Sequence, residues 1–304
     1  MKVYLITRTH GLYLHLLKSK DYDMLVQGKI DLNKLGYNVS IEKNSVDELL
    51  NDIVRKFVNR ILFLEKVAPE YSSFFRAFLE RLEVENIKAK LRYLHGIKGM
   101  EYYYPYEFLI DKNVLISLNS EREIIEHLRK TPLDIEQHFK RLKGRIEPIL
   151  LIAEVLLDIK YYEYYFSSLR NLEKTIFQMA YLERIITLIY WYMVLGEEQV
   201  NKLLSICNAT RLRMKEISRI LKLSQEKVKE YIENREYTHL VEVAENVFIR
   251  KLKKLVLRNK NNMFFVYYYM FSSYTEMRNL ERIILGRKME LRPEIIRGSL
   301  KILC

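Results

Sequence analysis

Turn-forming residues are scarce in this chain. Its 304 residues include only nine glycines and five prolines. β-Sandwiches and nucleotide-binding α/β folds need many tight turns and use more glycine than this. Long stretches rich in Leu, Ile, Glu, Lys and Arg, which are good helix formers, fill the space between the few breaks. We therefore expect an all-α protein, long enough for two or three units and a sizeable core.

Capping pairs, glycines and prolines indicate where the helices begin and end. Ser45 and Glu48 have capping-box spacing, and apolar residues follow them at helical intervals up to Pro69. Ser120 and Glu123 repeat this spacing ahead of another helix. The other long helices are expected over 71–95, 134–165 with an interruption around Gly144 and Pro148, 170–195 before Gly196, 239–259, and 262–285 before Gly286. Shorter helices are expected to fill 199–233, and a short last helix starts at Pro293.

A short signature, Glu-x-x-Asn-Ile/Leu followed by an arginine, occurs in two of these long helices. Its two copies are Glu83, Asn86, Ile87 and Arg92, and Glu276, Asn279, Leu280 and Arg282. A third long helix near the middle of the chain keeps a glutamate, Glu183, but lacks the asparagine. We infer three divergent helical repeats of roughly 97 residues each. Their expected boundaries are 1–133, 134–236 and 237–304, and the N-terminal residues can pack with the third repeat.

In each copy of the signature, the glutamate and the asparagine lie one helical turn apart. We expect these side chains to be structural and to hydrogen-bond neighbouring helices. Adjacent carboxylates such as Glu83 and Glu85 also stand among many lysines and arginines. Solvated ion pairing is the usual role of such carboxylates, and it is favoured here over acid–base catalysis.

Catalytic and ligand-binding motifs are missing from the sequence. It has no phosphate-binding GxxxxGK[ST], dinucleotide-binding GxGxxG, HExxH or GxSxG motif. No two of the six histidines are spaced i, i+4 on one helix, and Cys207 and Cys304 lie too far apart to indicate a disulfide framework or a zinc site. We expect no active site, no cofactor and no metal. The histidines are His10, His15, His95, His127, His138 and His239.

The chain is basic and rich in tyrosine. Its net charge of +12 attracts anionic partners, such as nucleic acid, anionic lipid or an acidic protein surface. The chain has 23 tyrosines, and some of them form clusters at 102–104, 161–165 and 267–269. Tyrosines can stack on nucleic-acid bases, or they can fill helix–helix contacts while their hydroxyls reach water. The helical context favours the second interpretation.

Residues 214–232 have the apolar spacing of a helix-turn-helix motif, with Ser224 as the expected cap of the second helix. The turn glycine usual in that motif is absent, and Lys222 and Leu223 occupy the turn. A similar segment, residues 120–133, stands at the corresponding place in the first repeat. We therefore interpret 214–232 as a repeat element, and nucleic-acid binding stays open as the alternative function.

No membrane-spanning segment or signal peptide is expected. The apolar runs at 185–195 and 263–271 are both too short to cross a bilayer. No small-residue cleavage site follows the N-terminus. We expect a soluble protein that can work beside a membrane.

Several segments together resemble the C subunit of archaeal A-type ATPases, called subunit d in eukaryotic V-type enzymes. They are YLITRTHGLYLHLLKSKDYDMLV at 4–26, ENIKAKLRYLHG at 85–96, EIIEHLRKTPL at 123–133, YYEYYFSSLRNLEK at 161–174 and YTEMRNLERIILGRKMELRPEIIRGSL at 274–300. The resemblance covers essentially the whole chain, with the segments in the family's order.

The resemblance implies a funnel of three similar helical domains around a pseudo-threefold axis. Such subunits sit on the membrane-embedded ring of proteolipid subunits, receive the foot of the central stalk, and pass rotation between the two. The expected partners are therefore the central stalk and the ring, with anionic lipid headgroups nearby and no nucleic acid. The resemblance implies no catalytic residue and no cofactor, and a peripheral location on the cytoplasmic side of the cell membrane.

Overall fold

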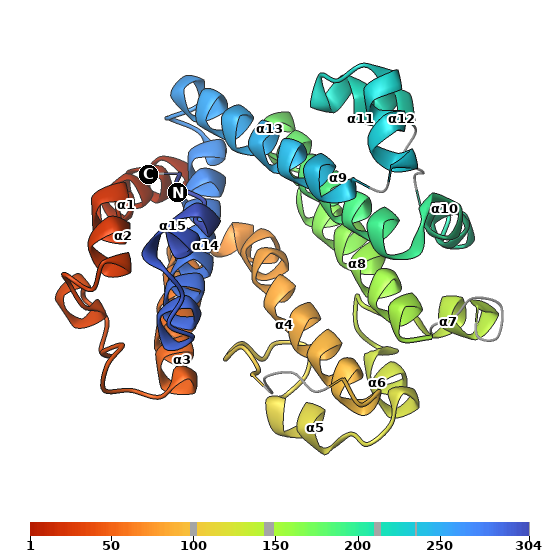
Figure 1. The fold of residues 1–304 in the computed structure, drawn as a ribbon, viewed down its shortest axis with the longest axis horizontal. Coiled ribbons are helices and arrows are strands. Elements are labelled where there is room, and N and C mark those ends of the chain that lie inside the picture. Colours follow the sequence, from red (N-terminus) through yellow and green to blue (C-terminus); the bar gives the residue numbers. More distant parts are fainter. Residues whose placement is uncertain (98–101, 143–148, 210–213, 235, 304) are drawn as a thin grey trace. The chain divides into compact units, whose positions relative to one another are not determined.

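The computed structural model describes residues 1–97, 102–142, 149–209, 214–234 and 236–303. Within these ranges every regular element is a helix, which confirms the all-α class (Figure 1). The predicted interruption at Gly144 and Pro148, and the terminal Cys304, lie outside the described residues.

The chain divides into two compact units. The first comprises Met1–Leu79, Tyr102–Tyr106 and Val256–Cys304, and the second comprises Glu80–Glu101 and Glu107–Leu255. The three-repeat boundaries at 133 and 236 remain a prediction.

The first unit is built on two long helices, α3 and α14, that pack along each other, with α1 and α15 against α14. Its helices are α1 (Lys2–Tyr13), α2 (Ser19–Val26), η1 (Leu32–Leu35), α3 (Val46–Val67), η2 (Pro69–Tyr71), the start of α4 (Ser72–Leu94), the end of α13 (Tyr237–Arg258), α14 (Met263–Lys288) and α15 (Pro293–Ser299).

The second unit contains most of α4 and α13 together with a series of shorter and longer helices, among which α8 packs on α9 and α9 on α10. These are α5 (Lys112–Ser117), α6 (Glu121–Leu128), α7 (Glu136–Leu142), α8 (Ile149–Ser168), α9 (Lys174–Leu195), α10 (Glu197–Ile206), α11 (Met214–Leu221) and α12 (Gln225–Glu233).

The predicted caps are confirmed. Ser45 precedes α3, and its hydroxyl and the Glu48 carboxylate form the reciprocal bonds of a capping box. The Ser120 hydroxyl accepts the backbone N–H of Glu123 at the start of α6. Pro293 is the first residue of α15, where its missing N–H costs no helical hydrogen bond.

The predicted end of the helix over 262–285 is wrong. Helix α14 continues through Gly286 to Lys288. The glycine has a packing role, since a Cβ atom at position 286 would lie 2.7 Å from Cγ1 and 2.9 Å from Cδ1 of Ile296 in α15. Gly286 thus lets α15 approach α14 closely, which a pattern that treats glycine as a helix stop does not indicate.

Gly286→Ala is expected to lower the free energy of unfolding by about 1–3 kcal/mol, because the added methyl overpacks the contact with Ile296. Gly298→Ala in α15 is the matched control, since no atom lies within 4 Å of a Cβ there. Urea unfolding followed by circular dichroism measures both variants. Equal stability of the two would contradict this role for Gly286.

The segment 214–232 forms the predicted pair of short helices, α11 and α12, which pack on each other. The Ser224 hydroxyl accepts the backbone N–H of Lys227, as expected for a cap. Lys222 occupies the turn with φ of 56°, a left-handed conformation that glycine adopts more easily. The turn is therefore made without the glycine whose absence the sequence shows.

The tyrosine clusters at 161–165 and 267–269 are packed inside the helical units. Tyr165, Tyr267 and Tyr269 are completely buried. This burial confirms that these side chains fill helix contacts, since a base-stacking tyrosine must expose its ring. The expectation that their hydroxyls reach water is wrong for Tyr165 and Tyr269, whose hydroxyl oxygens are buried.

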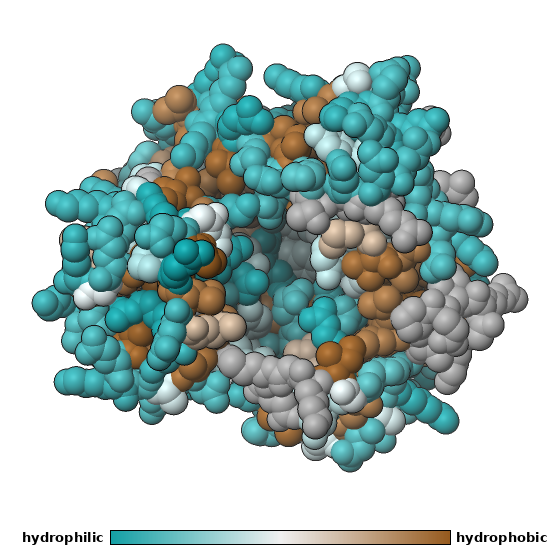
Figure 2. Space-filling view, viewed as in Figure 1, coloured by the Kyte–Doolittle hydropathy of each residue, from teal (hydrophilic) through white to brown (hydrophobic). Residues whose placement is uncertain are grey.

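Hydrophilic side chains cover much of the face seen in Figure 2. Among the described residues, no helix combines the length and apolarity needed to span a bilayer.

Candidate functional site

The second signature glutamate, Glu276 on α14, is a buried junction of the first unit. One carboxylate oxygen accepts the backbone N–H of Leu17 at 2.6 Å. The other accepts the Tyr37 hydroxyl at 2.8 Å and Nη1 of Arg60 at 2.6 Å. Arg60 comes from α3 and also donates to the Ser273 hydroxyl. Glu276 therefore joins α14 to α3 and to two non-helical segments of the N-terminal region.

One turn later on α14, Asn279 holds the C-terminal segment. Its side-chain amide donates to the Lys301 carbonyl at 2.7 Å, and its oxygen accepts the Lys301 N–H at 2.9 Å. Nη1 of Arg282 donates to the same oxygen at 3.3 Å. Asn279 is completely buried, so this pair of bonds replaces the water that the amide would otherwise need.

The first signature glutamate, Glu83 on α4, has a different set of partners. Its Oε1 accepts three consecutive backbone N–H groups, from Phe108, Leu109 and Ile110, at 2.8–3.1 Å. Its Oε2 is buried without a hydrogen-bond partner, and Glu83 forms no ion pair in the described part of the chain. Burial outweighs these three bonds and raises the pKa of Glu83 to about 7.

Two expectations for the signature need correction. Glu83 is not a solvated carboxylate, because it is completely buried. The partners of Glu83 and Asn279 are backbone groups of non-helical segments, where neighbouring helices had been expected. A buried polar group can be satisfied by any chain segment that passes it, so periodicity alone does not identify that segment. Asn86 is also buried, with 5% of its surface exposed.

We expect the buried charge of Glu83 to make the free energy of unfolding fall as the pH rises. The pKa of Glu83 is about 7 in the folded chain, against an ordinary value of 4.5. Between these two pH values the folded state binds more protons than the unfolded state, so raising the pH favours unfolding. Below pH 4.5 the proton held by Glu83 contributes about 3 kcal/mol to the free energy of unfolding. This contribution is fully lost above pH 7.

Glu83→Gln keeps an acceptor for the three N–H groups and removes the charge. The variant should therefore match the wild type near pH 4.5 and be more stable at pH 8, which urea unfolding at both pH values measures. Glu107→Gln, at an exposed neighbouring position, is the control and should leave the pH dependence largely unchanged. If Glu83→Gln kept the wild-type pH dependence, Glu83 would be excluded as its source.

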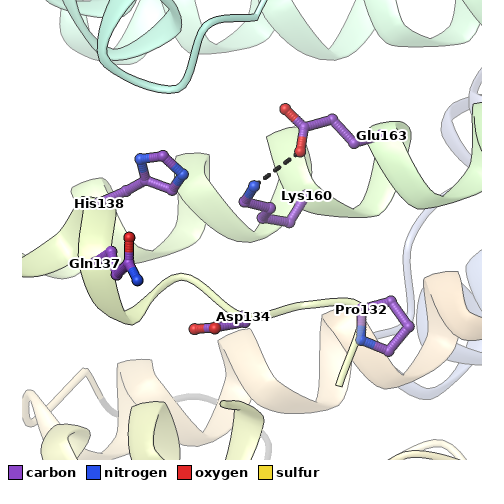
Figure 3. Close-up of a pocket in the computed structure, with 6 residues that line it drawn as sticks. All are labelled: Pro132, Asp134, Gln137, His138, Lys160 and Glu163. Carbon is purple, nitrogen blue, oxygen red and sulfur yellow. Dashed lines mark hydrogen bonds and ion pairs between the residues drawn. The ribbon is translucent and has the colours of Figure 1, made fainter. Parts of the chain in front are cut away.

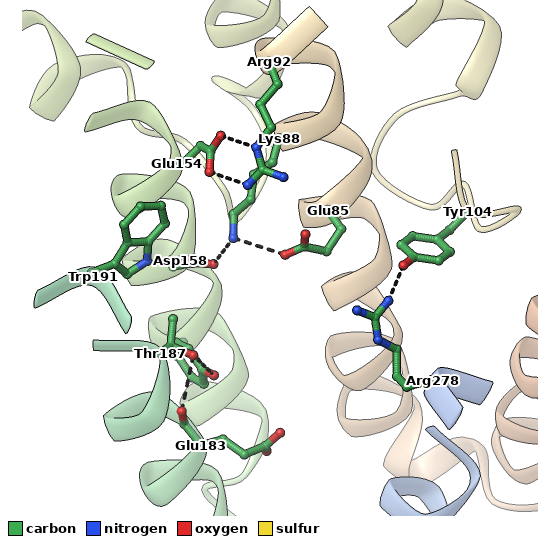
Figure 4. A network of polar contacts seen from close by, with 11 residues as sticks. Glu85, Lys88, Arg92, Tyr104, Glu154, Asp158, Glu183, Thr187, Trp191 and Arg278 are labelled. Carbon is green, nitrogen blue, oxygen red and sulfur yellow. Dashed lines mark hydrogen bonds and ion pairs between the residues drawn. The ribbon is translucent and has the colours of Figure 1, made fainter. Parts of the chain in front are cut away.

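The second unit contains a buried cluster around Asp158 on α8 (Figure 4). Nζ of Lys88, on α4, lies 2.6 Å from Oδ1 of Asp158 and 3.2 Å from Oε1 of Glu85. The Trp191 indole N–H, on α9, donates to Oδ2 of Asp158 at 2.7 Å. Burial alone would lower the pKa of Lys88, but the charges of Asp158 and Glu85 outweigh it and raise that pKa, so Lys88 stays charged.

Two further ion pairs join long helices of the second unit. Arg92, the signature arginine of α4, forms a bidentate pair with Glu154 on α8, at 2.7 and 2.6 Å. Arg81 on α4 donates to Glu183 on α9 at 3.1 Å. The middle glutamate thus contacts α4, and α4 is bonded to both α8 and α9 by charged side chains. Such charge-assisted hydrogen bonds form only at short donor–acceptor distances and with defined geometry. They therefore oppose the sliding of one helix along another.

Sequence reasoning missed most of these partners, including Arg60, Lys88 and Asp158. A usable signal existed for the acids, because Glu154 and Asp158 stand one turn apart in the otherwise apolar run LLIAEVLLDI. An acid on the apolar face of a helix has to be paired when it is buried. The basic partners carry no comparable signal, since lysine and arginine are common on all the helices.

A polar pocket of about 300 Å³ lies between α7, the segment before it, and α8 (Figure 3). Lys160 and Glu163 face it and pair with each other at 2.9 Å. Burial lowers the pKa of His138, which keeps this residue neutral at pH 7. In the part of the chain that the structure describes, no three His, Cys, Asp or Glu side chains are grouped to hold a metal ion. The pocket residues are Pro132, Asp134, Gln137, His138, Lys160 and Glu163.

The family model described as ATP synthase (C/AC39) subunit matches residues 5–299. A search of curated protein sequences found no match. The matched range includes both copies of the signature, the middle glutamate Glu183 and the ion pairs that join α4 to α8 and α9.

Proposed function

The chain belongs to the ATP synthase (C/AC39) subunit family, and we propose that it is the non-catalytic coupling subunit of an A/V-type rotary ATPase. In this role it joins the central stalk to the membrane proteolipid ring and transmits rotation between them. The complex then uses proton flow to make ATP, or ATP to pump protons. The observation that carries the proposal is the family match over nearly the whole chain.

The packing of the chain supports a mechanical role. A part that transmits torque must resist shear, and close-packed helices are stiff. Within each unit, ion pairs with little solvent exposure add fixed links between long helices: Arg60 with Glu276 in the first, and Lys88 with Asp158 in the second. Breaking such a pair is costly because it leaves an uncompensated buried charge. Glu83, Asn86, Arg92, Glu183, Glu276, Asn279 and Arg282 are proposed to be structural residues of this kind.

The proposed location is peripheral, on the cytoplasmic side of the membrane that holds the complex. Contact with the stalk and the ring should involve broad surfaces, because torque is resisted by many small interactions. Most single alanine substitutions at either surface should therefore be tolerated. The proposed arrangement of the helices is three repeats around a pseudo-threefold axis.

Purification from native membranes after gentle detergent extraction tests the proposal. The chain should copurify with stalk and ring subunits of a rotary ATPase, and increasing salt should release it before it unfolds, because salt screens exposed charges more than buried packing. Failure to associate with any ATPase would overturn the proposal. Sub-micromolar binding to duplex or single-stranded nucleic acid near physiological salt would then favour the alternative function.

A further inference from the structure

The end of helix α13 (Figure 1) carries a dense group of positive charges. Five of its last nine residues are basic, and a sixth cation follows in the next turn of the chain. No acidic residue occurs between Glu245 and Glu276, so this stretch contributes six of the chain's excess positive charges. The six cations are Arg250, Lys251, Lys253, Lys254, Arg258 and Lys260.

The charges on α13 share one face of the helix. At about 100° per residue, the five helical cations fall within about 160° of the helix circumference. All five are exposed, whereas Leu252, on the opposite side, is completely buried. We call these residues, together with Leu257, the basic face of α13.

The cations of the basic face lack acidic partners, unlike Lys88 and Arg92. None of them forms an ion pair with an acidic side chain of the described residues, and the Arg250 guanidinium donates only to the backbone carbonyl of Asn246. Five like charges on one helix face repel one another, so an anionic partner would stabilise this face.

Leu257 indicates the kind of anion. It lies within the arc of the cations and is 68% exposed. Cations that surround an exposed aliphatic side chain are typical of helices that lie at a lipid–water interface, where the aliphatic group enters the acyl boundary. A single-stranded nucleic-acid site would instead need aromatic rings for base stacking, and the aromatic residue nearest in this helix, Phe248, is buried.

We propose that the basic face of α13 binds the anionic phospholipid headgroups of the membrane beside which the chain works. This inference rests on the proposed function, since a subunit of a rotary ATPase lies next to a bilayer. Each cation near an anionic membrane surface strengthens binding to that membrane roughly five-fold. The attraction decreases within one Debye length of the surface. The face would thus add a salt-sensitive membrane contact to the protein contacts of the subunit.

The test uses the full chain and vesicles of phosphatidylcholine with or without phosphatidylglycerol. The wild type should sediment with the anionic vesicles and not with the neutral ones. The triple variant Lys251→Gln, Lys253→Gln and Lys254→Gln should bind at least about ten-fold more weakly. Leu257→Ser, which keeps every charge, should weaken binding several-fold. Circular dichroism checks that each variant is folded.

The matched control is Lys20→Gln, Lys34→Gln and Lys43→Gln, which removes the same charge from other exposed positions. It should leave vesicle binding nearly unchanged, and equal losses in both triple variants would overturn the proposal, because net charge alone would then explain binding. No binding of the wild type to anionic vesicles would also overturn it, as would selective loss of duplex DNA binding in the α13 variant.

Copurification of the α13 variant with the ATPase distinguishes this inference from the proposed function. If anionic vesicles bind the wild type but no ATPase copurifies with it, only the proposed function fails. If the wild type assembles with the ATPase and ignores vesicles, only the lipid contact fails. Loss of assembly in the α13 variant, without vesicle binding by the wild type, would assign the basic face to an acidic protein surface.

Discussion

Glu276→Gln is expected to lower the free energy of unfolding by about 3–5 kcal/mol, because it leaves the Arg60 guanidinium buried without its counter-ion. The glutamine also loses one of the carboxylate oxygens that accept Leu17, Tyr37 and Arg60. Hydrogen exchange gives a local readout, since the Leu17 N–H donates directly to Glu276 and should lose protection in the variant.

Replacing both members of this pair separates the cost of an unpaired charge from the value of the pair itself. The double variant Arg60→Met and Glu276→Leu should be more stable than Glu276→Gln, because neither charge remains buried alone. Arg76→Met is the control, since Arg76 pairs with Glu65 at a position where 41% of the arginine side chain is exposed. Glu276→Gln with the same stability as that control would contradict the structural role of the signature glutamate.

Lys88→Met is expected to destabilise the second unit by a similar amount, about 3–5 kcal/mol, because Asp158 then stays buried without its cation. Trp191 is the only tryptophan of the chain, and it donates to Asp158. Its fluorescence, excited where tyrosine does not absorb, therefore reports on this cluster alone. The unfolding midpoint in urea should move to lower concentration when it is followed by this signal.

Lys227→Met provides the comparison, because Lys227 and Glu230 form a pair at the protein surface. Exposed pairs contribute about 0–1 kcal/mol, so this variant should unfold like the wild type. The double variant Lys88→Met and Asp158→Leu should recover part of the loss. An unshifted Trp191 transition in Lys88→Met would show that the ion pair is not a structural link between α4 and α8.

The fold class and most helix boundaries could be predicted from the sequence because they depend on local chemistry. The Ser45–Glu48 capping box and Pro293 act within one turn of their own helix, so their spacing is sufficient evidence. Gly286 was misassigned for the opposite reason. Its function depends on Ile296, a residue of another helix, and a local pattern contains no information about that contact.

The buried polar contacts were only partly predictable. The repeated spacing identified Glu83 and Glu276 as equivalent positions, but their environments differ, since one binds three backbone N–H groups and the other a buried arginine. A nearby positive charge therefore balances the desolvation of Glu276 but not that of Glu83. At about pH 8, the same Glu→Gln substitution is expected to destabilise the chain at position 276 and to stabilise it at position 83. Sequence spacing cannot show this difference, because the partners come from distant parts of the chain.

Coupling between ATP hydrolysis and ion pumping tests the central claim most directly. The measurement compares both activities in membrane vesicles that contain the complete ATPase, in vesicles from which this chain has been removed, and in depleted vesicles to which it has been added back. If the chain links the stalk to the ring, the catalytic head should still hydrolyse ATP after depletion, pumping should stop, and addition of the chain should restore pumping. Pumping that continues at an unchanged rate without the chain would contradict the coupling role.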